Sequence, residues 1–331
     1  MEYRALGSTG IRVSAVSFGA GPVSQLLVGD PRDIQRQTIA TALAAGINWF
    51  DTAATYGDGQ SEENLGRILA ELQAAKRVHV ATKVRLMPNQ LSALGAHVRE
   101  SVLASLRRLR LEQIRLLQIH NSITRDTGAQ PTSITPSHVL AVGGVLEEIG
   151  RLQRQGLVAH AGLTGLGEPA ALTQLIETGA FATIQIPYNL LNASAGQIVP
   201  PDFSEANYGN LISACSRRGM GVFAIRVLAG GALAGQTPSP HTLKTPFFPL
   251  DLYQRDCCRA EALVPYLPSG MAREEAAVRF ALSHPGITSA IVGFATPAQV
   301  SEVVQFAAHG PLDAHDLARL NDGSPNAVPG G

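Results

Sequence analysis

Four polar side chains with complementary chemistry follow three consecutive strand-like runs. Asp51, Lys83 and His120 each come directly after a short apolar run, and Tyr56 follows five residues after Asp51. A phenol is a poor acid at neutral pH, because its ordinary pKa is about 10. A neighbouring ammonium lowers that pKa, and a carboxylate keeps the ammonium charged and in place. Tyr56 is therefore a candidate general acid/base for a carbonyl oxygen, which His120 would orient by a hydrogen bond.

Each of these residues has a structural explanation when taken singly. Asp51 could form a turn or cap a helix, and Lys83 could be a solvated residue at a strand end. His120 could be a hydrogen-bonded histidine at the rim, and Tyr56 could simply pack against its neighbours. A solvated residue should not recur at the same level of three successive strands, so their joint placement favours a shared site. They form neither a nucleophile–base pair nor a metal-ligand cluster, and no metal is expected. Proton delivery to a carbonyl implies a hydride donor, which means a nicotinamide cofactor.

Eight βα units are predicted to position these residues. Apolar, β-branched runs predict strands at 13–19, 48–53, 78–84, 114–120, 160–165, 183–189, 221–227 and 289–294. Amphipathic stretches predict helices at 33–45, 62–76, 91–109, 143–155, 170–178, 208–218, 272–283 and 297–308. Eight alternating units predict an α/β fold, a TIM (β/α)8 barrel, whose functional residues follow the carboxyl ends of the strands. A doubly wound sheet is the competitor, but the first βα turn has no G-x-G-x-x-G motif.

Three segments lie outside the repeated units. Residues 3–12 are predicted to form an N-terminal β-hairpin that plugs the barrel floor. Segments 121–142 and 229–270 are long loops that follow strands, so both should lie on the catalytic face, and the second is a candidate lid. Residues 1–321 are predicted to form one domain, and the Gly/Pro/Ser-rich residues 322–331 a disordered tail.

Composition excludes several classes of protein. The 331 residues carry 26 basic and 26 acidic side chains, which argues against a nucleic-acid or polybasic membrane binder. Hydrophobic residues make up 45% of the chain and supply a large core, yet no uninterrupted apolar run reaches membrane-spanning length. Three cysteines and the lack of an apolar signal core at the start predict a cytoplasmic protein. Neutral net charge leaves oligomers open without indicating one.

These motifs resemble the aldo-keto reductases over almost the whole chain. The resemblance rests on LGSTG (6–10), GINWFDTA (46–53), YG (56–57), ATK (81–83) and LLQIH (116–120). It implies a hairpin-plugged barrel that binds NADP(H) or NAD(H) without a Rossmann motif. It also implies that Asp51, Tyr56, Lys83 and His120 form the catalytic tetrad, with Tyr56 as proton donor and Asp51 also close to the cofactor.

The cofactor-binding half matches the family less closely. The resemblance assigns cofactor contacts to Ala20, Gly21, Thr164, Gln185, Ile225, Arg226, Leu228, Gly230, Gly293, Phe294 and Gln299. The fifth strand usually ends in Ser-Asn but here ends in Thr164-Gly165, which keeps the hydroxyl and loses the amide. Ile225 replaces the usual stacking aromatic. Arg226 takes the place of a small hydroxyl near the pyrophosphate, unless it is an outward-facing surface charge.

The predicted clamp for the cofactor's ribose carries no cation. Many NADP-preferring relatives have basic residues after the eighth strand, where this chain has Gly293, Phe294 and Gln299. A phosphate without a cation loses a contact worth roughly 1.5–3 kcal/mol, so NADH use or dual use is a live hypothesis. Phe294 also suits the core.

The expected substrate is a small carbonyl compound or its alcohol. Trp49 and Asn121, with Tyr56 and His120, are candidate substrate contacts, because ring stacking and hydrogen bonds suit a sugar. Trp49 equally suits the core, as strand-interior aromatics usually do. The alternative function is a slow, cofactor-sensing regulatory protein of the same fold. The intact tetrad argues against it, and the weakened carboxamide and stacking positions argue for it.

Overall fold

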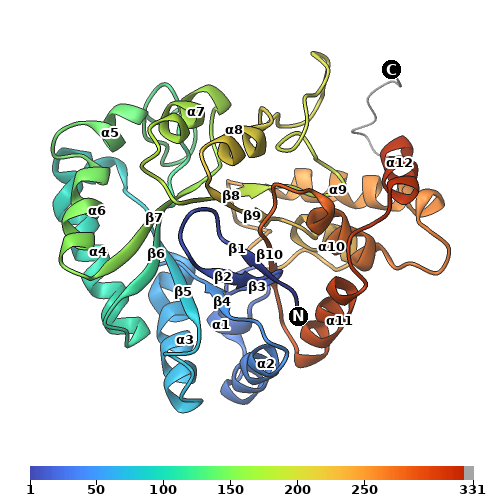
Figure 1. The fold of residues 1–331 in the computed structure, drawn as a ribbon, viewed down its shortest axis with the longest axis horizontal. Coiled ribbons are helices and arrows are strands. Elements are labelled where there is room, and N and C mark those ends of the chain that lie inside the picture. The colour runs from blue at the N-terminus through green and yellow to red at the C-terminus, as the bar shows by residue number, and fades with distance from the viewer. Residues whose placement is uncertain (324–331) are drawn as a thin grey trace.

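Eight parallel strands close into a barrel that is surrounded by helices (Figure 1). The structure is a computed structural model and describes residues 1–323. The strands follow the order β10-β3-β4-β5-β6-β7-β8-β9, and β9 pairs with β10 to close the ring. The predicted TIM barrel is confirmed. The competing doubly wound sheet is wrong, because an open sheet has no closing pair.

The observed strands and helices follow the predicted rhythm. The barrel strands are β3 (Val16–Gly19), β4 (Trp49–Asp51), β5 (His79–Val84), β6 (Ile114–Ile119), β7 (Val158–Thr164), β8 (Thr183–Pro187), β9 (Gly221–Ile225) and β10 (Ser289–Gly293). The helices that follow them are α2 (Arg32–Ala44), α3 (Gln60–Glu71), α4 (Leu94–Leu109), α6 (Val145–Arg154), α7 (Pro169–Glu177), α8 (Leu211–Arg217), α10 (Arg273–Ser283) and α11 (Pro297–Ala308). Additional helices are α1 (Leu26–Gly29), α5 (Pro136–Leu140), α9 (Leu250–Ala262) and α12 (Ala314–Gly323).

The predicted first strand is two strands with a turn between them. The segment β2 (Arg12–Ser14) pairs antiparallel with β1 (Tyr3–Ala5), and only β3 enters the barrel. The Asn48 side chain accepts from the backbone N–H of Ser14 at 2.9 Å, and the Ser14 hydroxyl donates to the Val16 carbonyl at 2.7 Å. These side-chain bonds replace strand pairing at the turn, and the apolar pattern of residues 13–19 gives no sign of them.

The hairpin β1–β2 closes the floor of the barrel, as predicted. Leu6 and Val13 are buried in a cluster with Trp49, Leu116 and Phe223. The hairpin turn also meets the chain just before β9, where the backbone N–H of Ser8 donates to the Gly219 carbonyl at 2.9 Å. A side chain at Gly7 would put its Cβ 2.4 Å from that same oxygen, so only glycine fits.

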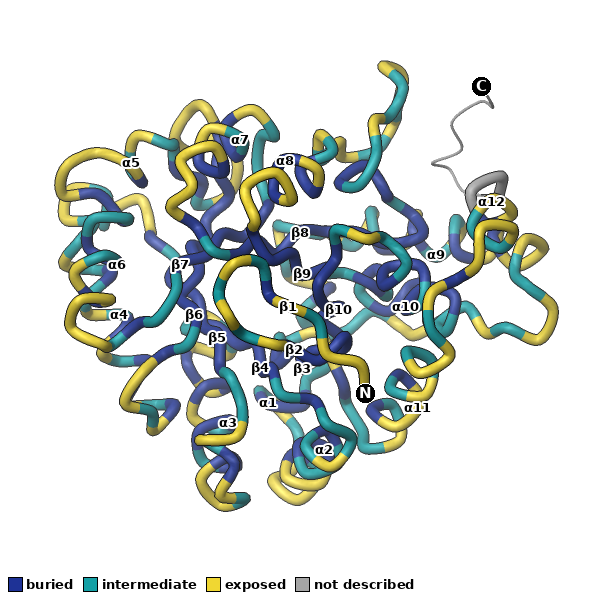
Figure 2. Tube along the Cα trace, viewed as in Figure 1, coloured by how far each residue is buried: buried dark blue, intermediate teal, exposed yellow. Residues whose placement is uncertain are grey.

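Buried side chains form one layer between the barrel strands and the helices and another inside the barrel. Figure 2 shows buried residues along the barrel strands and exposed residues on the outer helices and loops. Strand residues that face outward, such as Val16 and Phe18, join the large core between sheet and helices, whereas alternate residues face the barrel interior. The inward-facing residues at the carboxyl ends of the strands, beyond the layer that packs on the hairpin, are therefore the ones that can form a site at the mouth.

The two long loops contain structure of their own. Segment 121–142 holds α5, and segment 229–270 holds α9 and two 3-10 turns. Helix α12 runs to Gly323, two residues into the predicted tail, and the rest of that tail lies outside the described residues. That residues 1–321 form one domain stays a prediction. Within residues 1–323, no helix has both the length and the apolarity needed to cross a bilayer.

Candidate active site

The structure brings all four predicted tetrad residues together at the barrel mouth. Asp51 ends β4, Lys83 lies on β5, and His120 follows directly after β6, while Tyr56 opens the 3-10 turn after β4. The register pairs Asp51 with Ala81 on the neighbouring strand, which places Lys83 one inward-facing step beyond Asp51. Adjacent parallel strands thus present an acid, an ammonium and an imidazole to one point.

Lys83 links the carboxylate to the phenol. Its Nζ donates to Asp51 Oδ2 at 2.5 Å, to the Thr52 carbonyl at 2.8 Å and to the Tyr56 hydroxyl at 3.2 Å. The side chain is fully buried, with 1% of its surface exposed. Burial opposes the charge, but the Asp51 carboxylate outweighs it, so the pKa of Lys83 is raised. A permanent ammonium therefore faces the tyrosine oxygen.

Two glutamines hold the other oxygen of the carboxylate: Gln118, which the sequence analysis missed, and Gln185, which it assigned to the cofactor. Gln118 Nε2 donates to Asp51 Oδ1 at 3.1 Å, and Gln185 Nε2 donates to the same oxygen. Gln118 lies two residues before His120, so strand alternation turns both inward, and this spacing was a usable signal. With Lys83 on Oδ2, both oxygens of the buried carboxylate have donors, and its orientation is fixed.

His120 is neutral and lies against the tyrosine ring. The two ring centroids are 5.6 Å apart in an edge-on arrangement, and the Thr55 hydroxyl is 3.3 Å from His120 Nδ1. Burial lowers the pKa of His120 well below its ordinary 6.5, and the charges of Arg85 and Lys83 lower it further. A neutral imidazole can donate a hydrogen bond to a carbonyl oxygen without competing with Tyr56 as an acid.

Trp49 does not reach the site, which corrects its assignment as a substrate contact. Its side chain has no exposed surface and packs against Phe223 at a centroid distance of 4.9 Å. Trp49 faces inward like Asp51 but one step deeper, where the N-terminal hairpin covers it. The core explanation of this tryptophan is the right one.

Asn121 is also a structural residue, and its assignment to substrate is wrong. Its amide accepts from the Leu86 N–H at 2.9 Å and donates to the carbonyls of Leu86 and Thr132 at 2.8 and 2.6 Å. The side chain is fully buried, so no group of it remains for a ligand. It extends the pairing of β5 with β6 past the strand ends.

Four of the predicted cofactor contacts, Ala20, Gly21, Thr164 and Gln185, lie next to the tetrad. Gly21 borders the Tyr56 ring, since a Cβ there would lie 3.7 Å from it, and Ala20 is buried behind it. Thr164 ends β7 with a buried hydroxyl that has no hydrogen-bond partner among the described residues. An orphaned hydroxyl at this point suits a polar ligand group. Gln185, by contrast, already donates to Asp51.

Arg226 is neither a surface charge nor a free anion-binding group. Its guanidinium stacks on Phe248 at 3.9 Å and lies 3.6 Å from Asp256 of α9. Gly230 borders the same guanidinium, and Leu228 and Ile225 are half-buried nearby in sequence. The Asp256 carboxylate offsets the positive charge of Arg226, which was predicted to bind the cofactor's pyrophosphate. The contact between Arg226 and the pyrophosphate therefore stays a prediction.

The clamp after β10 is only partly exposed. Gly293 is exposed beside Ser24, and the Gln299 side chain accepts from the Ala295 N–H at 2.8 Å at the start of α11. Phe294 is fully buried and packs on Phe18 at 5.3 Å. Strand alternation turns its side chain toward the helices, so that side chain belongs to the core and does not support the predicted cofactor contact.

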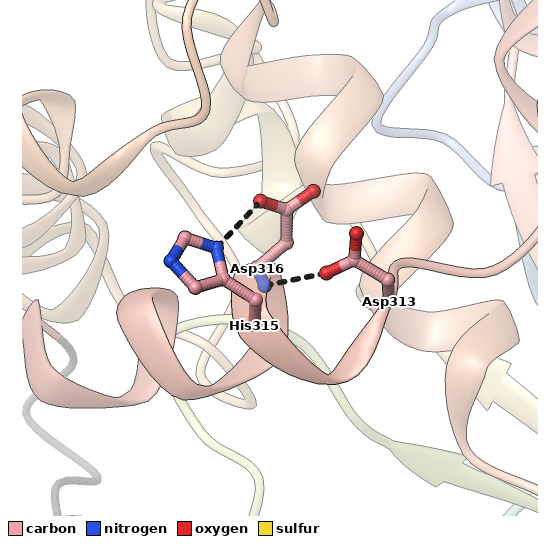
Figure 3. A group of neighbouring side chains, drawn as sticks. All are labelled: Asp313, His315 and Asp316. Atoms are coloured by element: carbon pink, nitrogen blue, oxygen red, sulfur yellow. Dashed lines mark hydrogen bonds and ion pairs between the residues drawn. The ribbon is translucent and has the colours of Figure 1, made fainter.

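One group of possible metal ligands lies far along the chain from the tetrad. Asp313, His315 and Asp316 cluster at the start of α12, and the first two are exposed (Figure 3). Asp313 accepts from the Asp316 N–H at 2.8 Å, as an N-cap does, and His315 is 3.7 Å from the Asp316 carboxylate. Helix capping explains this cluster.

Comparison with known proteins identifies the family. The sequence profile of the Aldo/keto reductase family matches residues 18–323, so the chain belongs to this family of oxidoreductases, which generally use a nicotinamide cofactor and small carbonyl substrates. It is 27% identical over 306 residues to L-galactose dehydrogenase from Arabidopsis thaliana, covering 92% of this chain and 87% of that protein. It is 26% identical to D-threo-aldose 1-dehydrogenase from a Pseudomonas species, covering 92% of each.

A solved structure shares the whole fold. The holo form of an aldo-keto reductase from Bacillus halodurans superposes with a TM-score of 0.74 at 21% identity, covering 99% of this chain and 97% of that one. At this identity the likeness shows the fold alone. The family resemblance stated from the tetrad motifs is confirmed by the family profile, and the solved structure confirms the fold.

Proposed function

We propose that the protein interconverts an aldehyde or ketone with its alcohol, using NADP(H) or NAD(H). The observation that carries this proposal is the buried Lys83 ammonium, which donates to both the Asp51 carboxylate and the Tyr56 hydroxyl. This arrangement favours proton transfer at the phenol oxygen, which acyl-transfer or metal-dependent hydrolysis would not need. Membership of the family supports the same reaction class.

In the proposed reduction, Tyr56 donates its hydroxyl proton to the carbonyl oxygen. The hydride for the carbonyl carbon would come from a reduced nicotinamide held beside Tyr56. Lys83 stabilises the phenolate that remains, Asp51 holds Lys83, and neutral His120 donates a hydrogen bond that orients the oxygen. Oxidation of the alcohol uses the same groups in reverse, with Tyr56 as the base.

The residues near the tetrad fit a nicotinamide. The orphaned Thr164 hydroxyl would bind its carboxamide, and Gly21 leaves space beside the Tyr56 ring. Toward the pyrophosphate, Arg226 and Gly230 are the predicted contacts, with Asp256 as a competing carboxylate. Gly293 and Gln299 offer no cation to a 2′-phosphate, which favours NADH use or dual use.

The substrate that we propose is sugar-like or sugar-derived. Trp49 and Asn121 no longer support this, so the support comes from two relatives, an L-galactose dehydrogenase and a D-threo-aldose 1-dehydrogenase. The names of both relatives specify polyhydroxylated substrates.

Replacing Tyr56 by phenylalanine tests the mechanism. We expect Tyr56→Phe to lower kcat by about 100-fold or more, the usual contribution of a general acid/base, while cofactor affinity changes little. Turnover is measured by nicotinamide absorbance and cofactor affinity by quenching of Trp49 emission. Near wild-type turnover in Tyr56→Phe would refute the proposed role. Tight cofactor binding without turnover of any carbonyl by the wild type would instead favour the cofactor-sensing alternative.

A further inference from the structure

Arg85 is a cation at the mouth that the reaction described above does not use. Strand alternation on β5 turns Ala81, Lys83 and Arg85 to the same side. Ala81 packs in the barrel interior and Lys83 bonds Tyr56, so Arg85 is the next inward position, one residue past the strand end. The Asn121 amide holds the backbone of the following residue, Leu86, on both its N–H and its carbonyl.

The Arg85 guanidinium has no hydrogen-bonding or ionic partner within residues 1–323. Its Nε is buried and unpaired, and the guanidinium carbon lies 4.4 Å from the centroid of the Phe247 ring. Arg85 is half-buried, so its guanidinium has lost part of its solvation, and a carboxylate or another acceptor normally compensates such a loss. An unpartnered guanidinium beside a reaction site therefore requires a reason.

Arg226, which follows β9, provides an internal comparison. It stacks on Phe248, the neighbour of Phe247, in the same way that Arg85 stacks on Phe247. Arg226, however, has the Asp256 carboxylate at 3.6 Å. The same loop thus covers two guanidiniums with two adjacent aromatic rings and supplies a carboxylate to only one of them.

The groups around Arg85 do not offset its charge. Burial lowers the pKa of His120 and of His241, and the charge of Arg85 lowers both further, so both effects favour the neutral imidazoles. Lys83 is already paired with Asp51. Of the three cations Lys83, Arg85 and Arg226, only Arg85 therefore has no carboxylate partner among residues 1–323.

We propose that Arg85 binds an anionic group of the carbonyl substrate, either a carboxylate or a phosphate. Both anions accept two parallel N–H bonds from a guanidinium, and Phe247 holds the plane of Arg85 in position for them. The inference rests on the proposed function and defines its substrate class: a carbonyl compound with a negative charge a few bonds from the reacting carbon. Arg85 lies two residue steps beyond Lys83, a rise of about 6.6 Å, which suits a chain of about four atoms.

Two matched substrate pairs test the proposal. Succinic semialdehyde is compared with its neutral analogue methyl 4-oxobutanoate, and glyceraldehyde 3-phosphate with glyceraldehyde. We expect kcat/KM of the wild type to favour one charged member by about 10- to 100-fold, the range of one charge-assisted contact. The favoured pair distinguishes a carboxylate from a phosphate. Equal kcat/KM within both pairs would overturn the inference.

Three variants assign the preference to Arg85. Arg85→Met should remove most of the charged-to-neutral ratio, and Arg85→Lys should keep part of it, since a lysine keeps the charge and loses the two-pronged geometry. Arg36→Met removes the same charge from an exposed position of α2 and should leave the ratio unchanged. A ratio in Arg85→Met equal to that of the wild type would contradict the assignment.

Ligand binding separates this inference from the proposed reaction. The thermal midpoint is measured with 4-hydroxybutyrate and with glycerol 3-phosphate, neither of which requires turnover. If these ligands raise the thermal midpoint of the wild type but not that of Arg85→Met, the result supports the anion site even if no carbonyl is reduced. Reduction of the neutral aldehydes without any such increase would instead support the reaction and overturn the anion site.

Discussion

Replacing Lys83 by methionine removes the buried ammonium while nearly keeping its volume. The variant leaves the Asp51 carboxylate buried with only the two glutamine amides, and leaves the Thr52 carbonyl without its donor. Removing one partner of a buried ion pair costs about 3–5 kcal/mol, because the remaining charge has no compensation. For a chain of 331 residues this corresponds to a thermal midpoint about 4–7 °C lower.

A second substitution separates the charge from the packing. In the double variant Lys83→Met/Asp51→Asn no charge remains, and the asparagine Oδ1 can still accept from Gln118 and Gln185. We expect the double variant to regain most of the lost stability and to unfold within about 1–2 kcal/mol of the wild type, since an uncharged replacement of a buried pair is often neutral. Activity should be lost in both variants, because the phenol has lost its ammonium.

Urea unfolding followed by Trp49 emission measures these free energies, and nicotinamide absorbance measures turnover. Trp49 is the only tryptophan and lies in the core two residues before Asp51. A loss below about 1 kcal/mol in Lys83→Met, or a double variant no more stable than Lys83→Met, would refute the claim that the ion pair is buried and mutually dependent.

Two further outcomes follow from the same geometry. The folded-state pKa of His120 is lowered, so the unfolded chain binds the proton more readily below about pH 6.5, and stability should fall as the pH drops from 7 to 5. In His120→Asn the free energy of unfolding, measured with urea at each pH, should change with pH less steeply than in the wild type, by about 1 kcal/mol per pH unit. The same pH dependence in both proteins would contradict this. Gln299→Arg supplies a cation to the predicted 2′-phosphate clamp and should raise the NADPH-to-NADH affinity ratio about tenfold. That ratio is read from Trp49 quenching, and an unchanged ratio would show that the clamp lies elsewhere.

Much of the barrel and the tetrad could be predicted because both depend on local signals. Apolar runs of the right length mark the strands, and polar residues at their ends mark the mouth. Asp51, Lys83 and His120 are all of this kind, and the structure brings them together with Tyr56. The split of the first strand was missed, since it depends on Asn48, which lies 34 residues from Ser14.

The wrong assignments share a different cause. Trp49 and Asn121 lie beside tetrad residues in sequence, yet depth within the barrel and distant backbone partners decide what each contacts. The N-terminal hairpin covers Trp49, and the Asn121 amide is occupied by the carbonyl of Leu86, after β5, and by the carbonyl of Thr132 in its own loop. Phe294 faces the helices because of its parity on β10. Proximity in sequence to a functional residue does not place a side chain in the site.

Strand parity would have corrected several of these assignments and found the residues that were missed. Positions two residues from a tetrad member on the same strand face the same side, one layer deeper or shallower. One step deeper gives Trp49 and Ala81, which pack into the floor, and Gln118, which holds Asp51. One step shallower from Lys83 gives Arg85, where solvent and ligand can enter. In this barrel the deeper layer fixes the tetrad, and the shallower layer is where differences in substrate charge can be recognised without disturbing it.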